Sequence, residues 1–228
     1  MPRARSPFVA ALADLSEALG ALRIDWYLFG AQAALIHGAA RVTADVDVTL
    51  RLGKVTPARL AAELRQYGFG LRIRDPSFVR TTRVLPVVHA RTSVPVDLVL
   101  AGPGLEDAFL ERAAVHDLGG VLVPVARAED LIVMKILAGR DKDLDDVAAM
   151  LDARGAELDA KEVRSTLEMV ESALGQSDLV PTWQRLRAGV ARSVPKREPK
   201  APKKSGGPRT RAKSSRARRR KRRASVKK

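Results

Sequence analysis

The stretch FGAQAALIHGAARVTADVDVTL, residues 29–50, decides the fold that we expect and carries the first candidate site. Gly30 forms a turn between an apolar strand and a short helix, and a second strand, residues 44–50, then alternates Asp45 and Asp47 with valines. Residues two apart on a strand point to the same face, so the two carboxylates should project together. Two like charges on an apolar strand favour cation binding; the alternative is a solvated strand face.

A third acid lies in VPVDLVL, residues 94–100, where Asp97 is surrounded by apolar residues. A carboxylate there is costly unless it binds a metal or, as the alternative, pairs with an arginine. Asp45, Asp47 and Asp97 could form one cluster on neighbouring strands. With oxygen ligands only, the favoured metal is Mg²⁺ or Mn²⁺. Such clusters are typical of phosphoryl or nucleotidyl transfer.

Two further features suit a triphosphate. Gly30 opens a helix whose first backbone amides could bind a phosphate group. A second charged cluster lies in LIVMKILAGRDKDLDDVAAML, residues 131–151, and contains Lys135, Arg140, Lys142, Asp143 and Asp146. Its basic groups fit phosphate oxygens, and the alternative is a turn between two helices with solvated charges.

The remaining pattern predicts an α/β (α+β) fold with strands and helices first and helices later. Expected strands cover residues 25–29, 44–50, 94–100 and 121–125, and residues 78–89 are β-like. Expected helices cover residues 8–22, 31–37, 57–67, 105–113, 128–138, 144–154, 160–174 and 178–188. We therefore expect a core over residues 1–126, a helical subdomain over residues 127–192 and a tail over residues 193–228.

Charge is distributed unevenly along the chain. Residues 195–228 hold 17 Lys and Arg against one acid, so the net charge of +15 becomes −1 without them. This segment has almost no large apolar residue, which predicts a disordered polybasic tail that binds nucleic acid backbones, RNA first, without sequence preference. The alternatives are a solubility tail or contact with an anionic membrane.

Composition excludes several other classes. The chain has no cysteine, which excludes disulfides and thiolate metal sites and fits a reducing cytoplasm. No apolar run is long enough to span a bilayer, so we expect a cytoplasmic protein without membrane association. His37 is expected to cap or pack against its helix, and no histidine has the spacing of a zinc ligand.

These motifs resemble the nucleotidyltransferase superfamily that includes DNA polymerase β. The resemblance is greatest to the branch of the AbiEii and MenT-type toxins of type IV toxin–antitoxin systems, which pairs a Gly-Gly or Gly-Ser turn with R-x-T-x-D-x-D. The matching residues are Gly30, Arg41, Thr43, Asp45 and Asp47, then Asp97, and in the later motif Lys135, Arg140, Lys142, Asp143 and Asp146. Ala31 replaces the second Gly or Ser of the turn, and Lys142 stands where the branch favours Arg.

The resemblance implies a nucleotidyltransferase fold, with a small mixed β-sheet flanked by helices, that transfers a nucleoside monophosphate from an NTP. Asp45 and Asp47 would hold Mg²⁺, Asp97 would hold a second metal or accept the proton of the acceptor hydroxyl, and Lys135 would neutralise phosphate charge. The acceptor would be tRNA, other RNA, a protein or a small molecule, and a cognate antitoxin would be a candidate partner.

The main rival hypothesis is a nucleotidyltransferase fold that has lost activity and binds nucleic acid through its tail. Ala31 favours this rival, because the turn lacks the serine hydroxyl that would touch the phosphate.

Overall fold

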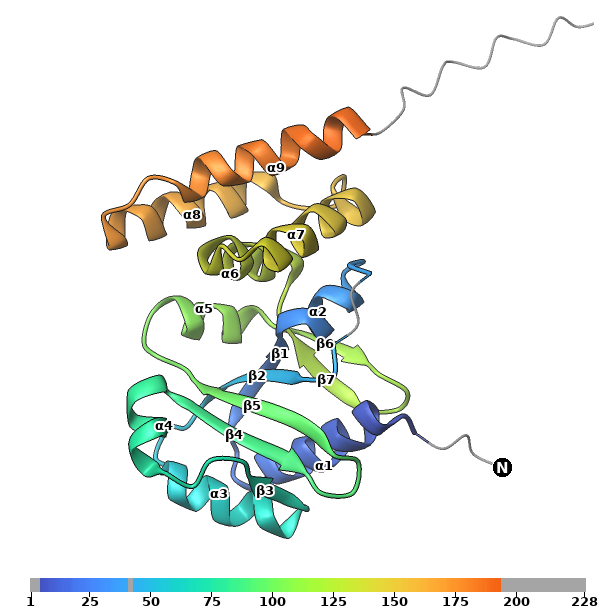
Figure 1. The fold of residues 1–228 in the computed structure, drawn as a ribbon, viewed down its shortest axis with the longest axis vertical. Helices are drawn as coiled ribbons and strands as arrows, with labels where there is room; N and C mark the ends of the chain where they lie inside the picture. The colour runs from blue at the N-terminus through green and yellow to red at the C-terminus, as the bar shows by residue number, and fades with distance from the viewer. Residues whose placement is uncertain (1–4, 41–42, 194–228) are drawn as a thin grey trace, which may run out of the picture. The chain divides into compact units, whose positions relative to one another are not determined.

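The computed structural model describes residues 5–40 and 43–193, which form a mixed α/β fold (Figure 1). Seven strands make one sheet in the order β3-β4-β5-β2-β1-β7-β6. The strands are β1 (Asp25–Phe29), β2 (Val46–Arg51), β3 (Phe69–Leu71), β4 (Val84–His89), β5 (Val94–Leu100), β6 (Ala114–Asp117) and β7 (Leu122–Val125). The predicted α/β class with a helical second half is confirmed.

The helices of the described residues cover both faces of the sheet. They are α1 (Pro7–Ala21), α2 (Gly30–Ile36), α3 (Pro57–Gln66), α4 (Pro76–Thr82), α5 (Leu105–Arg112), α6 (Ala128–Ala138), α7 (Asp141–Arg154), α8 (Ala160–Leu174) and α9 (Leu179–Ser193). Helix α1 contacts β5 and α3, whereas α5 contacts β1 and β2. Helices α6 to α9, yellow to orange in Figure 1, stack together beyond one end of the sheet.

The central strands have the register that the acid pattern predicts. Strand β2 pairs with β1 antiparallel and with β5 parallel, and Asp47 lies opposite both Phe29 and Asp97. Val46 and Val48 alternate with Asp47 and are fully buried on the other face. A period of two thus puts the apolar side chains into the core and leaves Asp47 and Asp97 on one face.

Local signals explain where two helices begin and end. The Thr56 hydroxyl accepts a hydrogen bond from the Arg59 amide, and Pro57 occupies the first turn, so α3 starts where the sequence predicted. Helix α6 ends at Gly139, whose φ of 65° allows its amide to donate to the Lys135 carbonyl. This turn starts α7 immediately afterwards, three residues earlier than predicted.

Two expectations need correction. Residues 78–89 were expected to be β-like, but residues 76–82 form α4, because Asp75 accepts a hydrogen bond from the Ser77 amide and Pro76 occupies the first turn. The predicted strand 44–50 begins at Val46, so Asp45 lies just before β2. The short strands β3 and β6 were not predicted; each pairs with one neighbour at an edge of the sheet.

The sheet and helices of residues 5–40 and 43–193 form one compact unit. The division of that unit at residue 126 stays a prediction, and the polybasic tail lies outside the described residues. None of the described helices is both long enough and apolar enough to cross a bilayer.

Candidate active site

The Asp47 carboxylate lies against the first residue of α2. Gly30 has a φ of +69°, and a Cβ atom at Gly30 would come within 2.0 Å of Asp47 Oδ2. Only glycine therefore lets the carboxylate approach this turn so closely. Phe29 is the N-cap residue of α2, and its side chain makes no hydrogen bond to the first backbone amides of the helix.

The surroundings of Asp47 disfavour its ionised form. Burial and the nearby carboxylates of Asp97 and Asp45 raise the pKa of Asp47 to about 6, and the cations Lys135 and Arg140 oppose this rise. A carboxylate whose ionised form is disfavoured by burial and by like charges gains most from a cation bound beside it. The set of oxygen donors therefore fits a hard divalent cation such as Mg²⁺ or Mn²⁺.

Asp97 already has a basic partner. The Arg72 guanidinium, in the segment after β3, donates a hydrogen bond to Asp97 Oδ1. This is the alternative that the sequence left open for the third acid. Among the described residues, no three His, Cys, Asp or Glu side chains are grouped closely enough to hold a metal ion. The three-carboxylate metal site thus stays a prediction, and it requires Asp97 to turn away from Arg72.

The segment before β2 is held from α2. Gln32 Nε2 donates to the Thr43 carbonyl oxygen at 2.7 Å, and the Asp45 amide donates to Thr43 Oγ1 at 3.4 Å. Ala31 is buried in the first turn of α2, and Asp45 is exposed. Arg41 lies outside the described residues, so its predicted role in nucleotide binding has no structural account here.

The second predicted cluster forms a buried network of ion pairs. Lys135 Nζ lies 3.2 Å from Asp143 Oδ1 and 2.7 Å from Asp146 Oδ2, and all three side chains are at most 5% exposed. Arg140 also donates to Asp143. Burial raises the pKa of Asp143, but hydrogen bonds from Arg140 and Lys135 outweigh this, so its pKa lies below the usual value. The Lys135 ammonium is therefore engaged within the protein, and its charge still acts on Asp47.

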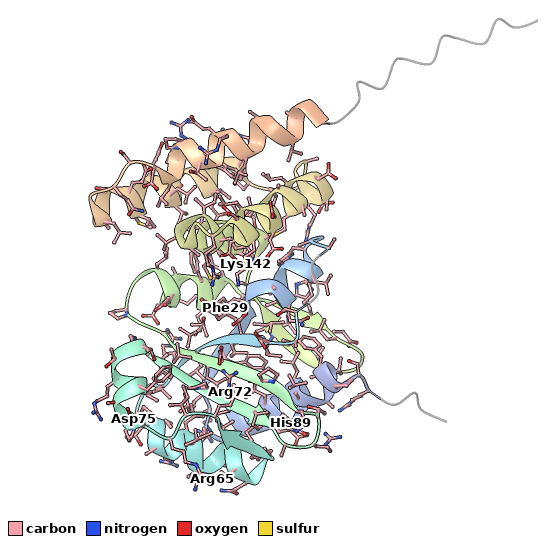
Figure 2. The ribbon with its side chains drawn as sticks, viewed as in Figure 1. Phe29, Arg65, Arg72, Asp75, His89 and Lys142 are labelled. Atoms are coloured by element: carbon pink, nitrogen blue, oxygen red, sulfur yellow. The ribbon has the colours of Figure 1, made fainter. Side chains whose placement is uncertain are left out.

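The structure brings the two clusters together, because α2 contacts both α6 and α7. The Arg140 side chain is 63% exposed, and Lys142 is exposed as well. Figure 2 shows Lys142 at the edge of the helical layer that faces the sheet, with Phe29 at the end of β1. Arg140 and Lys142 are thus accessible to an anionic ligand, whereas Lys135 is enclosed.

A cavity of about 440 Å³ lies on the same face of the sheet as the acids. Thr49 and Val99 line it, and each is two residues beyond Asp47 or Asp97 on its strand. Aromatic side chains and residues around α5 and α6 complete the wall, and one of them is an acid: Tyr27, Phe29, Pro103, Leu105, Glu106, Phe109, Met134 and Leu137. Burial raises the pKa of Tyr27 to about 12, so its phenol is protonated and can donate a hydrogen bond.

His37 has a structural position, which confirms that it packs within the core. Its Nε2 lies 2.7 Å from the Ala126 carbonyl oxygen, and Arg154 donates to its Nδ1 at 2.9 Å. These partners lie at the end of β7 and on α7, so His37 ties α2 to both. Burial lowers the pKa of His37, and the neutral ring fits its two partners.

Reasoning from the sequence missed Arg72, Gln32 and the aromatic cavity. Arg72 was missed because β3 was not predicted; the alternation of Phe69, Leu71 and Ile73 was the available signal for an extended segment beside β4. The cavity could not be found, because its walls come from five separate elements: β1, β2, β5, α5 and α6.

Part of this chain matches a family of known proteins. Residues 81–177 match the model of a family described as "Nucleotidyl transferase of unknown function (DUF2204)". The matched segment includes Asp97 and the whole Lys135–Asp146 cluster. No curated protein matches the sequence significantly.

Two solved structures have a low similarity to this chain. A nucleotidyltransferase-like antigenic protein from Paracoccidioides brasiliensis is 16% identical, with a TM-score of 0.47 over 79% of this chain and 94% of that one. The enzyme ANT(2'')-Ia in complex with adenylyl-2''-tobramycin is 14% identical, with a TM-score of 0.42 over 82% of this chain and 98% of that one. The family match supports nucleotidyl transfer as the class of reaction and leaves the substrate open.

Proposed function

We propose that this protein is a metal-dependent nucleotidyltransferase of the AbiEii/MenT-like type that transfers a nucleoside monophosphate from an NTP to RNA, with tRNA as the first acceptor to test. The observation that carries the proposal is the Asp47 carboxylate, which lies against Gly30 and in register with Asp97. Its pKa of about 6 indicates an ionised group at neutral pH that is short of positive charge.

In this proposal Asp45 and Asp47 would hold Mg²⁺ or Mn²⁺. The cation would neutralise triphosphate oxygens and stabilise the charge that develops on the leaving group. The residues of the chain supply the remaining functions: the first amides of α2 would bind a phosphate group, and Arg140 and Lys142 would bind other phosphate oxygens. Lys135 would hold Asp143 and Asp146 in place and add positive potential near Asp47.

The acceptor hydroxyl would attack the α-phosphorus in line. The bond between the α-phosphorus and the bridging oxygen would break, pyrophosphate would leave, and the acceptor proton would pass to Asp97. For this step the Arg72 guanidinium must release the Asp97 carboxylate, which then faces the reacting atoms. Most of the rate enhancement would come from positioning and electrostatics.

The cavity beside the acids suits the base of the NTP. Its volume of about 440 Å³ accommodates one nucleobase with its ribose but not a folded acceptor. Phe29 is the partly exposed aromatic side chain that a planar ring could contact, whereas Tyr27, Thr49 and Phe109 are at most 3% exposed. The acceptor would then approach from the Asp97 side of the acid pair.

Transfer of label from each α-labelled NTP to total cellular RNA, with Mg²⁺ or Mn²⁺ present, tests the reaction. We expect label on RNA from at least one NTP, and a loss of about a thousandfold or more in Asp45→Asn and Asp47→Asn. Asp152→Asn, which changes an exposed acid on α7, is the matched control and should keep full activity. An Asp45→Asn protein that labels RNA at the normal rate would sink the proposed mechanism.

The tail provides the proposed link to RNA. Residues 195–228 carry a net charge of +16 and would concentrate RNA around the site. Deletion of these residues should weaken RNA binding and flatten its dependence on salt while leaving the transfer to small acceptors intact. An unchanged salt dependence would contradict this role.

The rival hypothesis is an inactive nucleotidyltransferase fold that binds nucleic acid. The Arg72–Asp97 ion pair and Ala31 favour it, because the first occupies the third carboxylate and the second removes a phosphate-binding hydroxyl. No labelling of RNA, protein or small acceptors with any NTP, together with tail-dependent RNA binding, would establish the rival.

The toxin-like branch adds one test in cells. A toxin of this type should arrest growth when it is expressed, and a cognate antitoxin should relieve the arrest. Growth arrest that persists in Asp47→Asn would separate toxicity from nucleotidyl transfer.

A further inference from the structure

A second and larger cavity lies on the opposite face of the sheet from the acids. It has a volume of about 660 Å³ and runs between α3 and α4 (residues 57–66 and 76–82). Leu85 and Leu100 form its floor, and Leu100 is three residues from Asp97 on β5, so the two side chains point to opposite faces. A ligand in this groove, which we call the α3–α4 groove, would not contact the candidate active site.

The lining of the α3–α4 groove is aliphatic. Its walls are formed by short and branched side chains, among them Ala58, Ala61, Leu71, Ile73 and Val79. None of the residues that line it is Phe, Tyr or Trp. A planar ring would find no aromatic surface to stack on, whereas an alkyl chain would match the lining.

The rim of the groove is strongly basic. Arg65, Arg74, Arg80 and Arg83 line it, and Asp75 is the single acid among the lining residues. None of these four arginines makes an ion pair within 4.0 Å with a carboxylate of the residues described. The Asp75 carboxylate already accepts hydrogen bonds from the Ser77 amide and hydroxyl, at 2.8 and 2.5 Å.

The four arginines differ in whether their guanidinium groups are available to bind a ligand. Arg83 donates to the carbonyl oxygens of Leu100 and Ala101, so its guanidinium is tied to the backbone. Arg65, Arg74 and Arg80 are exposed, and Arg80 lies within electrostatic reach of Asp75. In Figure 2, Arg65 and Asp75 lie at the outer side of α3 and α4, and Arg72 lies on the sheet. Three guanidinium groups thus surround the mouth of the groove with little negative charge among them.

Helix α4 forms one wall of the groove, and none of its residues is fully buried. Ile73, just before α4, is 36% exposed, which leaves a branched apolar side chain in contact with water. An amphipathic ligand would cover this apolar wall and supply the missing negative charge.

We propose that the α3–α4 groove binds a small anion with an alkyl body, such as a medium-chain carboxylate or alkyl phosphate. The alkyl chain lies on the aliphatic floor, and the anionic head binds Arg65, Arg74 and Arg80, since a guanidinium group pairs well with carboxylate and phosphate oxygens. The site is separate from the acids, so it stands or falls independently of nucleotidyl transfer.

Titration calorimetry of the full chain with decanoate, decyl phosphate, 1-decanol and acetate tests this proposal. The two amphipathic anions should bind at one site, each about tenfold or more tighter than 1-decanol, which lacks the charge. The comparison of the two heads shows which anion is preferred. Acetate, which has the charge without the chain, reports the attraction of anions to the basic residues 195–228.

Variants locate the site. Arg65→Gln/Arg80→Gln should weaken decanoate binding by about tenfold or more, and Ala58→Phe should block the groove sterically. Arg164→Gln, which changes an arginine paired with Glu168 on α8, should bind decanoate normally. Circular dichroism establishes that each variant is folded. The proposal is overturned if decanoate fails to bind, if 1-decanol binds equally well, or if the groove variants and the Arg164 variant behave alike.

Discussion

The protein has two charged clusters that differ in how their charges are balanced. The sheet cluster consists of Asp45, Asp47 and Asp97, and the helical cluster consists of Lys135, Arg140, Asp143 and Asp146. On the sheet, Asp47 stands among other acids, and burial with its neighbours raises its pKa to about 6. Between α6 and α7, Asp143 is buried, yet its pKa is lowered because Arg140 and Lys135 donate hydrogen bonds to it. The helical cluster is balanced within the fold, whereas the sheet cluster is short of positive charge. This difference supports the proposal of a cation beside Asp47, with the balanced helical cluster adding positive potential nearby.

The largest expected effect comes from unbalancing the helical cluster. Lys135→Met leaves two buried carboxylates without their ammonium partner, so we expect the free energy of unfolding to fall by about 3–5 kcal/mol. Urea denaturation followed by circular dichroism measures this. Lys142→Met, which removes an exposed lysine of the same segment, should change stability by about 0.5 kcal/mol or less. Equal losses in both variants would mean that the buried network is not what stabilises α6 against α7.

Removing a charge from the sheet cluster should raise the free energy of unfolding, whereas removing one from the helical cluster lowers it. The pKa of Asp47 rises from 3.8 to about 6 on folding, so the ionised side chain destabilises the fold above pH 6, and the penalty disappears as pH falls below about 4. Asp47→Asn should therefore stabilise the protein by about 1–3 kcal/mol at pH 7, with little change at pH 4. Denaturation midpoints at both pH values, with Asp152→Asn for comparison, measure the effect. A destabilised Asp47→Asn protein at pH 7 would break the contrast between the clusters.

His37 connects the two regions and gives a pH dependence of its own. Its pKa in the folded protein lies below the ordinary value of 6.5, so the neutral ring is favoured and stability is complete above that pH. Stability should fall as pH drops from 7 to 5, because burial, and to a lesser extent the charge of Arg154, disfavours the protonated ring. The His37→Gln protein, which cannot be protonated there, should lose less over the same range. Parallel pH profiles for the two proteins would argue against His37 as the cause.

The smallest effect concerns Arg72. Its ion pair with Asp97 is partly exposed, so Arg72→Gln should cost about 1 kcal/mol of stability or less. The same change frees the Asp97 carboxylate, and we expect Mn²⁺ to bind about threefold more tightly, measured by electron paramagnetic resonance of free Mn²⁺. Weaker Mn²⁺ binding in Arg72→Gln would show that Arg72 supports the acid site instead of competing with a cation for it.

Much of the fold could be predicted because its signals are local. The alternation around Asp47 and Asp97, the Thr56–Pro57 start of α3 and the apolar periodicity of α6 depend only on neighbouring residues. Strands β1 and β5 and helices α6 and α8 have the predicted bounds. Residues 76–82 were missed because Val79 and two threonines favour a strand, while the capping contact of Asp75 decides for a helix.

The site could be predicted in its members but not in its pairings. Asp45, Asp47, Asp97 and the Lys135–Asp146 segment stand out as charges in apolar surroundings, which the sequence alone reveals. Which charge faces which partner depends on strand order and on the packing of distant elements. Arg72 meets Asp97 only because β3 and β4 return beside β5.

The sequence by itself therefore determined that acids share one face of the central strands, since a period of two follows from the backbone alone. The tertiary structure decided which of those acids meets a basic partner among the residues it describes, since Asp97 pairs with Arg72. Burial and the distances between charges set the pKa of Asp47 and of Asp143, and both quantities exist only after the chain has folded.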